Sequence, residues 1–173
     1  NQTFEESTVK DGMDIAFCSL DYKNMLLEYA GAYNSLYIIR TNKSDQTQEE
    51  MLKDFDCSNK VEFKEIRAQS QLVEVKANKF PIGVFVGEEL KTFSNNRVKV
   101  QKGDTVYIFS DGYMDQFGGQ KGRKFMAKRF REVILKCQTL SMSKQRDYLD
   151  RVIEEWRIIA PGSNEKYEQI DDI

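Results

Sequence analysis

The chain has 173 residues, enough for one domain with a sizeable core, and its 40% hydrophobic and 31% charged residues are typical of a globular protein. Its 28 acidic residues nearly balance 26 basic ones, and the resulting net charge of -2 argues against nucleic acid as a partner. No apolar run approaches the roughly 20 residues that cross a bilayer, so we expect no membrane contact by this segment.

The sequence contains no histidine. This excludes a Ser-His-Asp triad, a Cys-His pair and a histidine-containing zinc site within it. Chemistry at neutral pH must then rely on carboxylates, lysine, tyrosine, cysteine or metal-bound water. The three cysteines, Cys18, Cys57 and Cys137, are widely spaced and unpatterned, so we expect a reducing, cytoplasmic setting.

The first predicted elements are three strands in an antiparallel meander. Residues 13–20 and 25–30 form a hairpin around the turn 21–24, and residues 36–40 form the third strand after a break at 31–34. The connections are too short for the crossovers that parallel strands require.

The polar segment 41–71 is interpreted as a surface insertion that carries one short helix. Thr47 to Glu50 fits a capping box, and Met51 and Leu52 follow on one helical face. The alternative is a decorated loop of no functional importance, because surface loops tolerate insertions well.

The rest of the chain predicts more strands and then two helices. Residues 72–76 form a strand, and residues 97–100 pair with residues 105–109 in a hairpin. Helices at about 125–138 and 143–156 carry apolar side chains at helical spacing. The expected architecture is therefore α+β, with helices packed on one face of an antiparallel sheet in a single domain.

The most informative feature is the strand that ends in Ser110-Asp111-Gly112, with a second acid, Asp115, four residues later. An acid at the C-terminal end of such a strand is held by rigid backbone, which suits a site that must keep its geometry. Two more carboxylates, Asp171 and Asp172, stand near the end of the sequence. Two bare carboxylates about 4 Å apart repel by about 4 kcal/mol at an effective dielectric near ~20, so such a cluster suggests a bound divalent metal.

Each of these acids also has a simpler interpretation. A lone Asp-Gly after a strand is usually a turn, and Asp115 equally fits a solvated surface acid. Asp171 and Asp172 on their own could be an acidic tail. Asp14 is interpreted as a surface acid on a strand rather than a ligand.

Together these blocks resemble the metal-dependent protein phosphatases of the protein phosphatase 2C (PP2C) superfamily, and within them the bacterial SpoIIE-type serine phosphatases. The run 102–119 is the closest match. Residues 29–36 resemble the family's Ala-Gly turn, with its His and Pro positions changed, and residues 80–83 resemble its Pro-Leu-Gly element. Residues 169–172 correspond to its terminal metal-binding acids.

The resemblance implies a PP2C-like α-β-β-α sandwich, incomplete at both ends. The family's N-terminal metal aspartate and its final core strand are not found, so residues 1–173 would be the C-terminal portion of a phosphatase domain. Asp111 and Asp171 would hold one metal with Asp172 beside them, and Asp115 would belong to a weaker additional metal. Ser110 and Gly112 would support the site. No other catalytic or cofactor-binding residue is implied, and the complete domain would hold two Mg²⁺ or Mn²⁺ ions.

The implied activity is that of a metal-dependent protein serine/threonine phosphatase. It would hydrolyse phosphoserine or phosphothreonine on a regulatory protein, such as an antagonist of an anti-sigma factor, with metal-activated water. Sensor domains would precede it in the parent protein. We expect little or no turnover from the chain alone. The alternatives are a non-catalytic regulatory or interaction module that keeps the phosphatase fold, and an unrelated metal protein with oxygen ligands.

Overall fold

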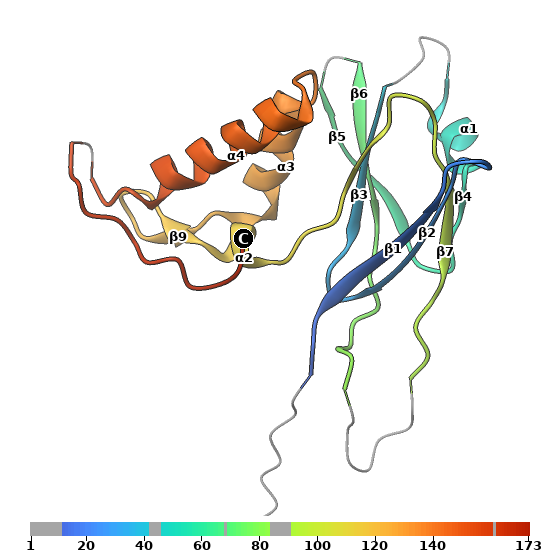
Figure 1. Ribbon diagram of the computed structural model, residues 1–173, viewed down its shortest axis with the longest axis horizontal. Coiled ribbons are helices and arrows are strands. Elements are labelled where there is room, and N and C mark those ends of the chain that lie inside the picture. The colour runs from blue at the N-terminus through green and yellow to red at the C-terminus, as the bar shows by residue number, and fades with distance from the viewer. Residues whose placement is uncertain (1–11, 42–45, 68, 84–90, 161) are drawn as a thin grey trace, which may run out of the picture.

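The computed structural model describes residues 12–41, 46–67, 69–83, 91–160 and 162–173. Two antiparallel sheets lie face to face, and a pair of long helices packs against one of them (Figure 1). The expected α+β class is confirmed. Of the helices in the described ranges, none is both long and apolar enough to cross a membrane.

Each sheet has four strands. We call the one away from the helices the outer sheet and the one beneath them the central sheet. The outer sheet contains, in spatial order, β1 (Ile15–Asp21), β2 (Leu26–Ala32), β7 (Asn96–Lys99) and β4 (Phe55–Asp56). The central sheet contains β5 (Val61–Arg67), β6 (Ser70–Val75), β3 (Leu36–Thr41) and β8 (Thr105–Tyr107).

The remaining elements follow or connect the strands. A short ribbon pairs β9 (Phe117–Gly118) with β10 (Arg123–Lys124). The helices are α1 (Gln48–Leu52), α2 (Gly112–Asp115), α3 (Met126–Cys137) and α4 (Met142–Arg157). The two long helices therefore lie close to their predicted ranges.

Strand β3 lies at the centre of the fold because both of its faces are buried. Tyr37 and Ile39 join the core beneath the helices, whereas Leu36 and Ile38 join the core between the sheets. Side chains alternate across a strand, so this uninterrupted apolar run supplies both cores at once. The helix-side core also contains Leu72, Tyr113, Phe125, Phe130, Val133, Ile134, Leu135 and Ile153.

The predicted three-stranded meander is wrong at its third strand. β1 and β2 form the expected hairpin, but β3 pairs with β6 and β8 in the other sheet. The chain changes sheets at the break after β2, where Tyr33 has a left-handed φ of 57°. Such a bend ends the extended conformation, so β3 cannot continue alongside β2.

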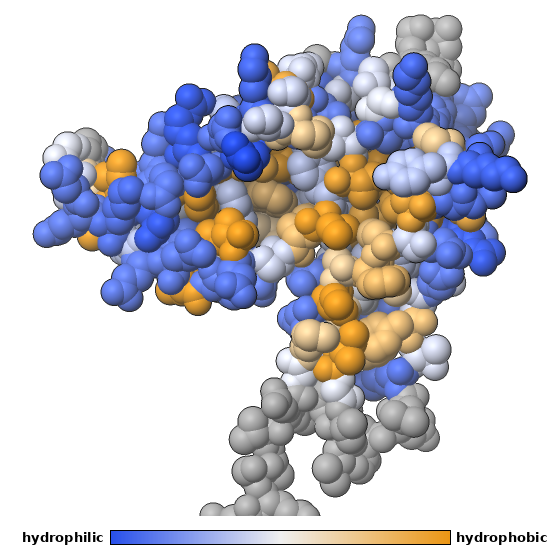
Figure 2. Space-filling view, viewed as in Figure 1, coloured by the Kyte–Doolittle hydropathy of each residue, from blue (hydrophilic) through white to orange (hydrophobic). Residues whose placement is uncertain are grey.

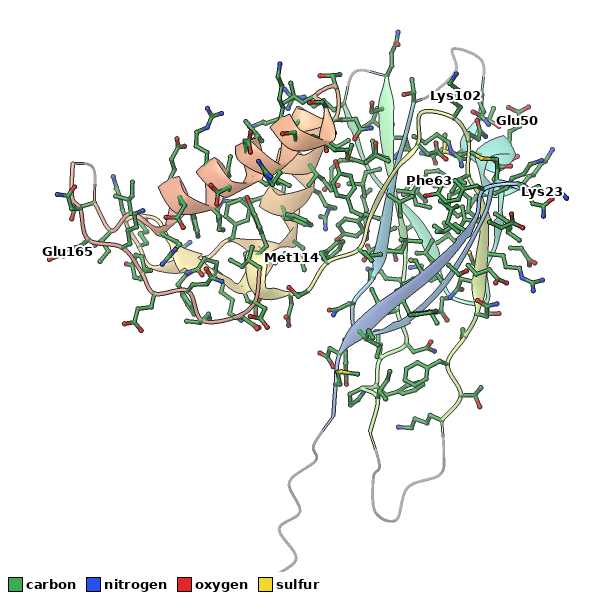
Figure 3. All side chains as sticks on the ribbon, in the orientation of Figure 1. Lys23, Glu50, Phe63, Lys102, Met114 and Glu165 are labelled. Atoms are coloured by element: carbon green, nitrogen blue, oxygen red, sulfur yellow. The ribbon has the colours of Figure 1, made fainter. Side chains whose placement is uncertain are left out.

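The predicted hairpin between residues 97–100 and 105–109 is also wrong. β7 pairs with β2 and β4, and β8 pairs with β3, so the turn marked by Lys102 in Figure 3 carries the chain between sheets. Asp104 fixes this turn because its carboxylate accepts hydrogen bonds from the Arg40 guanidinium, the shortest at 2.7 Å. Arg40 is 1% exposed and also donates to Asp54 at 2.7 Å.

The polar segment 41–71 contains more regular structure than the one short helix predicted for it. That helix is α1, and Thr47 and Glu50 form the expected capping box. The same segment also supplies β4 to the outer sheet and β5 to the central sheet, although residues 42–45 and 68 lie outside the described part. The polar composition of this segment did not indicate these strands. β5 is only partly buried, so it does not need the apolar residues that mark a buried strand.

Some hydrophobic side chains of the strands remain exposed. Figure 2 shows hydrophobic side chains gathered over the strands on the side turned to the viewer. Large exposed hydrophobic side chains in and beside the strands include Phe17, Val106 and Ile108.

Candidate metal-binding site

Asp111 stands immediately before α2, at the end of the short corner segment that connects β8 to this helix. β8 ends at Tyr107, two residues earlier than predicted, and the backbone carbonyl of Asp111 accepts the N–H groups of Met114 and Asp115, both at 2.9 Å. The Asp111 side chain does not cap the helix. Within the described residues its carboxylate has no hydrogen-bond or ion-pair partner, so it is available to a ligand.

The C-terminal tail, residues 168–172, lies against this corner. Ser110 Oγ donates a 2.7 Å hydrogen bond to the Asp172 carbonyl. A Cβ built on Gly112 would stand 3.3 Å from Asp171 Cβ. The structure therefore brings Asp171 next to the Asp111 corner.

Gln116 fixes the other end of the tail. Its side chain is fully buried, and Nε2 donates to the carbonyls of Glu168 at 2.8 Å and Phe117 at 3.0 Å. The backbone carbonyl of Gln116 in turn accepts a hydrogen bond from the Trp156 indole N–H at 3.1 Å. Gln116 thus connects the tail to α4, and its role as an anchor was not predicted.

Asp14, interpreted from the sequence as a surface acid, is exposed in the structure, and the charge of Asp111 acts on it. Partial burial raises the pKa of the Asp14 carboxyl, and the negative charge of Asp111 raises it further. Two carboxylates that interact in this way favour a proton or a cation between them. No sequence pattern indicated this pairing, because Asp14 and Asp111 belong to different segments of the fold.

Asp115 and Asp172 have other partners in the structure. Asp115 Oδ2 lies 2.5 Å from Lys124 Nζ, so a lysine neutralises this carboxylate. Asp172 contacts the corner through its backbone, and its N–H donates to Asp171 Oδ1 at 2.8 Å. Among the described residues, no three acidic or cysteine side chains converge as a complete metal site.

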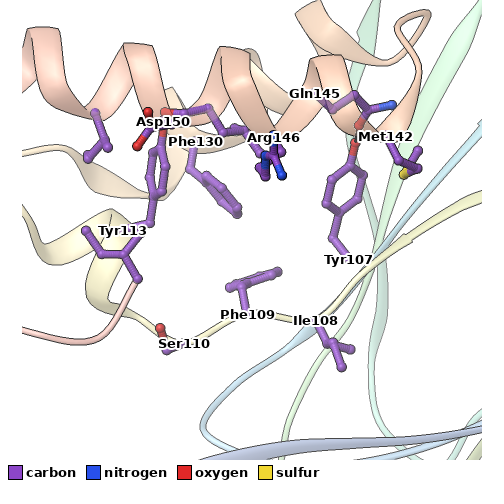
Figure 4. A pocket seen from close by; sticks show the side chains of 13 residues that line it. Tyr107, Ile108, Phe109, Ser110, Tyr113, Phe130, Met142, Gln145, Arg146 and Asp150 are labelled. Carbon is purple, nitrogen blue, oxygen red and sulfur yellow. Dashed lines mark hydrogen bonds between the residues drawn. The ribbon is translucent and has the colours of Figure 1, made fainter.

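Two cavities flank the corner. The larger one, of about 500 Å³, lies on the helix side and is lined mainly by aromatic and aliphatic side chains such as Tyr113 and Phe130 (Figure 4). Ser110 stands at its edge. The smaller one, of about 210 Å³, lies on the sheet side and has Asp111 in its wall. The acid at the corner therefore opens toward the smaller cavity.

The donors at the corner fit a hard divalent cation, because they are carboxylate oxygens rather than nitrogen or sulfur. Among the described residues the Asp111 carboxylate has no hydrogen-bond or ion-pair partner, Asp171 lies beside the same corner, and the charge of Asp111 raises the pKa of Asp14. These acids lie around one corner of the fold without forming a complete metal site among the described residues.

The family model described as Stage II sporulation protein E (SpoIIE) matches residues 66–173, which is more than half of the chain. Among solved structures, the chain is similar to the SiaA-PP2C domain of Pseudomonas aeruginosa, with 20% sequence identity and a TM-score of 0.58. The match covers 88% of this chain but 46% of that one, so this chain spans about half its length. This similarity confirms a PP2C-like fold. No curated protein sequence matches the chain.

Proposed function

The chain belongs to the SpoIIE family, and from this membership we propose that it is part of a protein serine/threonine phosphatase that depends on Mg²⁺ or Mn²⁺. The single observation that supports this role most directly is the juxtaposition of Asp111 with the Asp171 segment. Two distant parts of the chain meet there, and each supplies a carboxylate.

Asp111 and Asp171 would hold the ion, and Asp14 would add negative charge to the site. When bound there, a divalent ion would supply a water nucleophile at neutral pH and would stabilise charge on a phosphoryl oxygen. Ser110 and Gly112 would keep the tail in place so that the two carboxylates stay in register. Asp115 would join an additional ion only after releasing Lys124.

The cysteines do not compete for the role of nucleophile. Burial raises the pKa of the Cys18 and Cys57 thiols to about 11, and burial also raises the pKa of the Cys137 thiol. All three are free cysteines that stay protonated at neutral pH, whereas the reactive form is the thiolate. Free thiols also suit a reducing compartment, and a cytoplasmic location is part of the proposal.

The proposed substrate is a phosphorylated regulatory protein, such as an antagonist of an anti-sigma factor, and the proposed upstream partners are sensor domains. Family membership suggests the reaction class. The site itself favours a phosphate ester, because a cation between carboxylates is a site for phosphoryl oxygens rather than for apolar ligands.

The experiment is a phosphatase assay on the full-length protein that carries this chain. p-Nitrophenyl phosphate and a phosphoserine peptide are supplied with Mn²⁺ and, separately, with EDTA. We expect turnover with Mn²⁺ and its loss in EDTA. Asp111→Asn should lower kcat/KM by about a hundredfold or more, whereas Asp147→Asn, an exposed acid on α4, should match the wild type.

Metal-independent turnover, or an Asp111→Asn variant as active as the wild type, would contradict the proposal. Absence of turnover with both substrates in Mn²⁺ would instead identify a non-catalytic module that keeps the fold.

A further inference from the structure

The smaller cavity beside Asp111 has the size of a pocket for one side chain. Its volume is about 210 Å³, below the ~300–1,000 Å³ that is typical of pockets for drug-sized ligands. Aromatic and aliphatic groups of Tyr33, Tyr37, Phe109 and Met114 form most of its wall. A group seated there would lie directly beside the Asp111 carboxylate.

Apart from Asp111, the side chains that line the cavity offer no unpaired charge to a cationic or anionic group. Glu74 lines it, but its Oε2 is 2.8 Å from Lys76 Nζ and 3.1 Å from Lys64 Nζ. The remaining acid, Asp111, belongs to the proposed metal site. Because Glu74 is already neutralised, the cavity favours an apolar occupant.

Tyr33 stands at the mouth of this cavity on a turn that is held firmly. The side chain is 52% exposed, and its φ of 57° is uncommon for an aromatic residue. The Tyr33 N–H donates to the Asn78 carbonyl at 2.9 Å. The buried Tyr29 hydroxyl donates to the Asn34 carbonyl at 2.7 Å and closes the turn from below.

Gly31 shows how closely this turn is built. A Cβ at that position would stand 2.1 Å from the Tyr29 hydroxyl oxygen and 2.6 Å from the Asn34 carbonyl oxygen. The left-handed Tyr33 is therefore imposed by several contacts rather than by a loose loop.

A second left-handed residue borders the same cavity. Met126 has a φ of 74°, and the next residue, Ala127, lines the wall. Among the described residues the third non-glycine residue with positive φ is Met25, which ends the β1–β2 turn, where such values are ordinary. Backbone strain that persists in a folded protein gathers at ligand sites, so its concentration here points to binding.

We propose that Tyr33 determines substrate specificity, by packing its ring against an apolar side chain adjacent to the phosphoserine of the protein substrate. The inference rests on the proposed function and adds the chemical class of the neighbouring residue. A rigid, half-exposed aromatic ring is well suited to this role, because it offers contact area while losing little conformational freedom. Asn34 and Ser35, also in the wall, offer polar groups to the peptide backbone.

The test compares two phosphoserine peptides in the full-length protein with Mn²⁺. In one, leucine stands on both sides of the phosphoserine, and in the other, alanine does. We expect the wild type to prefer the leucine peptide through a lower KM. Tyr33→Ala should raise KM for that peptide about tenfold and leave kcat nearly unchanged. Tyr33→Phe should behave as the wild type.

Two controls separate this inference from a general defect. Tyr22→Ala removes another exposed tyrosine, 79% exposed at the β1–β2 turn, and should not alter either peptide's KM. p-Nitrophenyl phosphate has no flanking residue, so Tyr33→Ala should lose less activity on it than on the leucine peptide.

Equal KM values for the two peptides in the wild type, or a Tyr33→Ala variant that keeps the preference, would overturn the inference while p-nitrophenyl phosphate turnover still supports the phosphatase. An equal loss on p-nitrophenyl phosphate would also overturn it, because the residue would then act on the whole site. Loss of all turnover in the wild type would instead count against the proposed function.

Discussion

The Asp172 carbonyl oxygen occupies the space in which a side chain on Gly112 would begin. A Cβ at residue 112 would stand 2.1 Å from that oxygen, well inside van der Waals contact, and 3.3 Å from Asp171 Cβ. The obstacle is backbone, which cannot rotate aside as a side chain would. The tail can therefore bring Asp171 alongside Asp111 only because residue 112 is a glycine.

Gly112→Ala should displace the tail and damage the site more than the fold. We expect kcat/KM with Mn²⁺ to fall by about ten- to a hundredfold, because a displacement near 1 Å can cost that much in a positioned site. Activity assays and calorimetric Mn²⁺ titration measure the effect. Gly103→Ala is the matched control: its φ of 96° strains the variant, but no atom lies within 4 Å of its Cβ. An activity loss as large in Gly103→Ala would mean that stability alone explains it.

Ser110→Ala should loosen the tail without unfolding the protein. It removes the 2.7 Å hydrogen bond to the Asp172 carbonyl, which is exposed to solvent, so the free energy of unfolding should fall by no more than about 1 kcal/mol. Affinity for Mn²⁺ should fall at the same time. Ser19→Ala, on the exposed part of β1, should change neither quantity. An unchanged Mn²⁺ affinity in Ser110→Ala would show that the hydrogen bond does not position the site.

Lys124→Met tests whether Asp115 can serve an additional ion. Removing the ammonium group frees a carboxylate that the structure pairs at 2.5 Å. We expect Mn²⁺ to bind the additional, weaker site about three- to tenfold more tightly. The Lys124 ammonium group would no longer compete with the ion for the Asp115 carboxylate. Titration calorimetry measures it. The double variant Lys124→Met with Asp115→Asn should lose the gain, and a gain that persists would exclude Asp115.

Arg40→Met should destabilise the fold strongly. Arg40 and Asp104 are both buried, and the variant would leave the Asp104 carboxylate without its partner where the chain passes between sheets. Breaking such a pair costs about 3–5 kcal/mol, measurable by urea unfolding. Arg146→Met removes an exposed ion pair on α4 and should cost less than about 1 kcal/mol. Equal effects in the two variants would contradict the structural importance of the buried pair.

The Glu62 carboxylate gives the fold a pH-dependent contribution at acid pH. Hydrogen bonds from Lys60 and then Lys64 lower its pKa from 4.5 to about 2. A carboxyl group whose pKa is lower in the folded state than in the unfolded state stabilises the fold at a pH above its unfolded-state pKa. This stabilisation is lost as the pH falls through the folded-state pKa. Glu62→Gln should therefore melt below the wild type at pH 7, and the difference should shrink between pH 4.5 and 2. A difference that widens on acidification would reverse the assigned sign.

The sequence by itself determined the elements that depend on local pattern. The helical spacing of apolar residues located α3 and α4, and Thr47 with Glu50 located the start of α1. Alternation and turn residues located the β1–β2 hairpin. The motif run around Asp111, together with the distal acids, indicated the family, and the family model matches residues 66–173.

Only the tertiary structure decided which strands share a sheet and that Asp14 and Asp111 interact. β3 and β8 lie in a different sheet from the strands that precede them, because the Tyr33 bend and the Arg40–Asp104 pair redirect the chain. The interaction of Asp14 with Asp111 arises across such long-range packing and has no signature in local sequence. Local periodicity reports which face of an element is buried, but the partner that buries it is chosen by contacts between residues far apart in the chain.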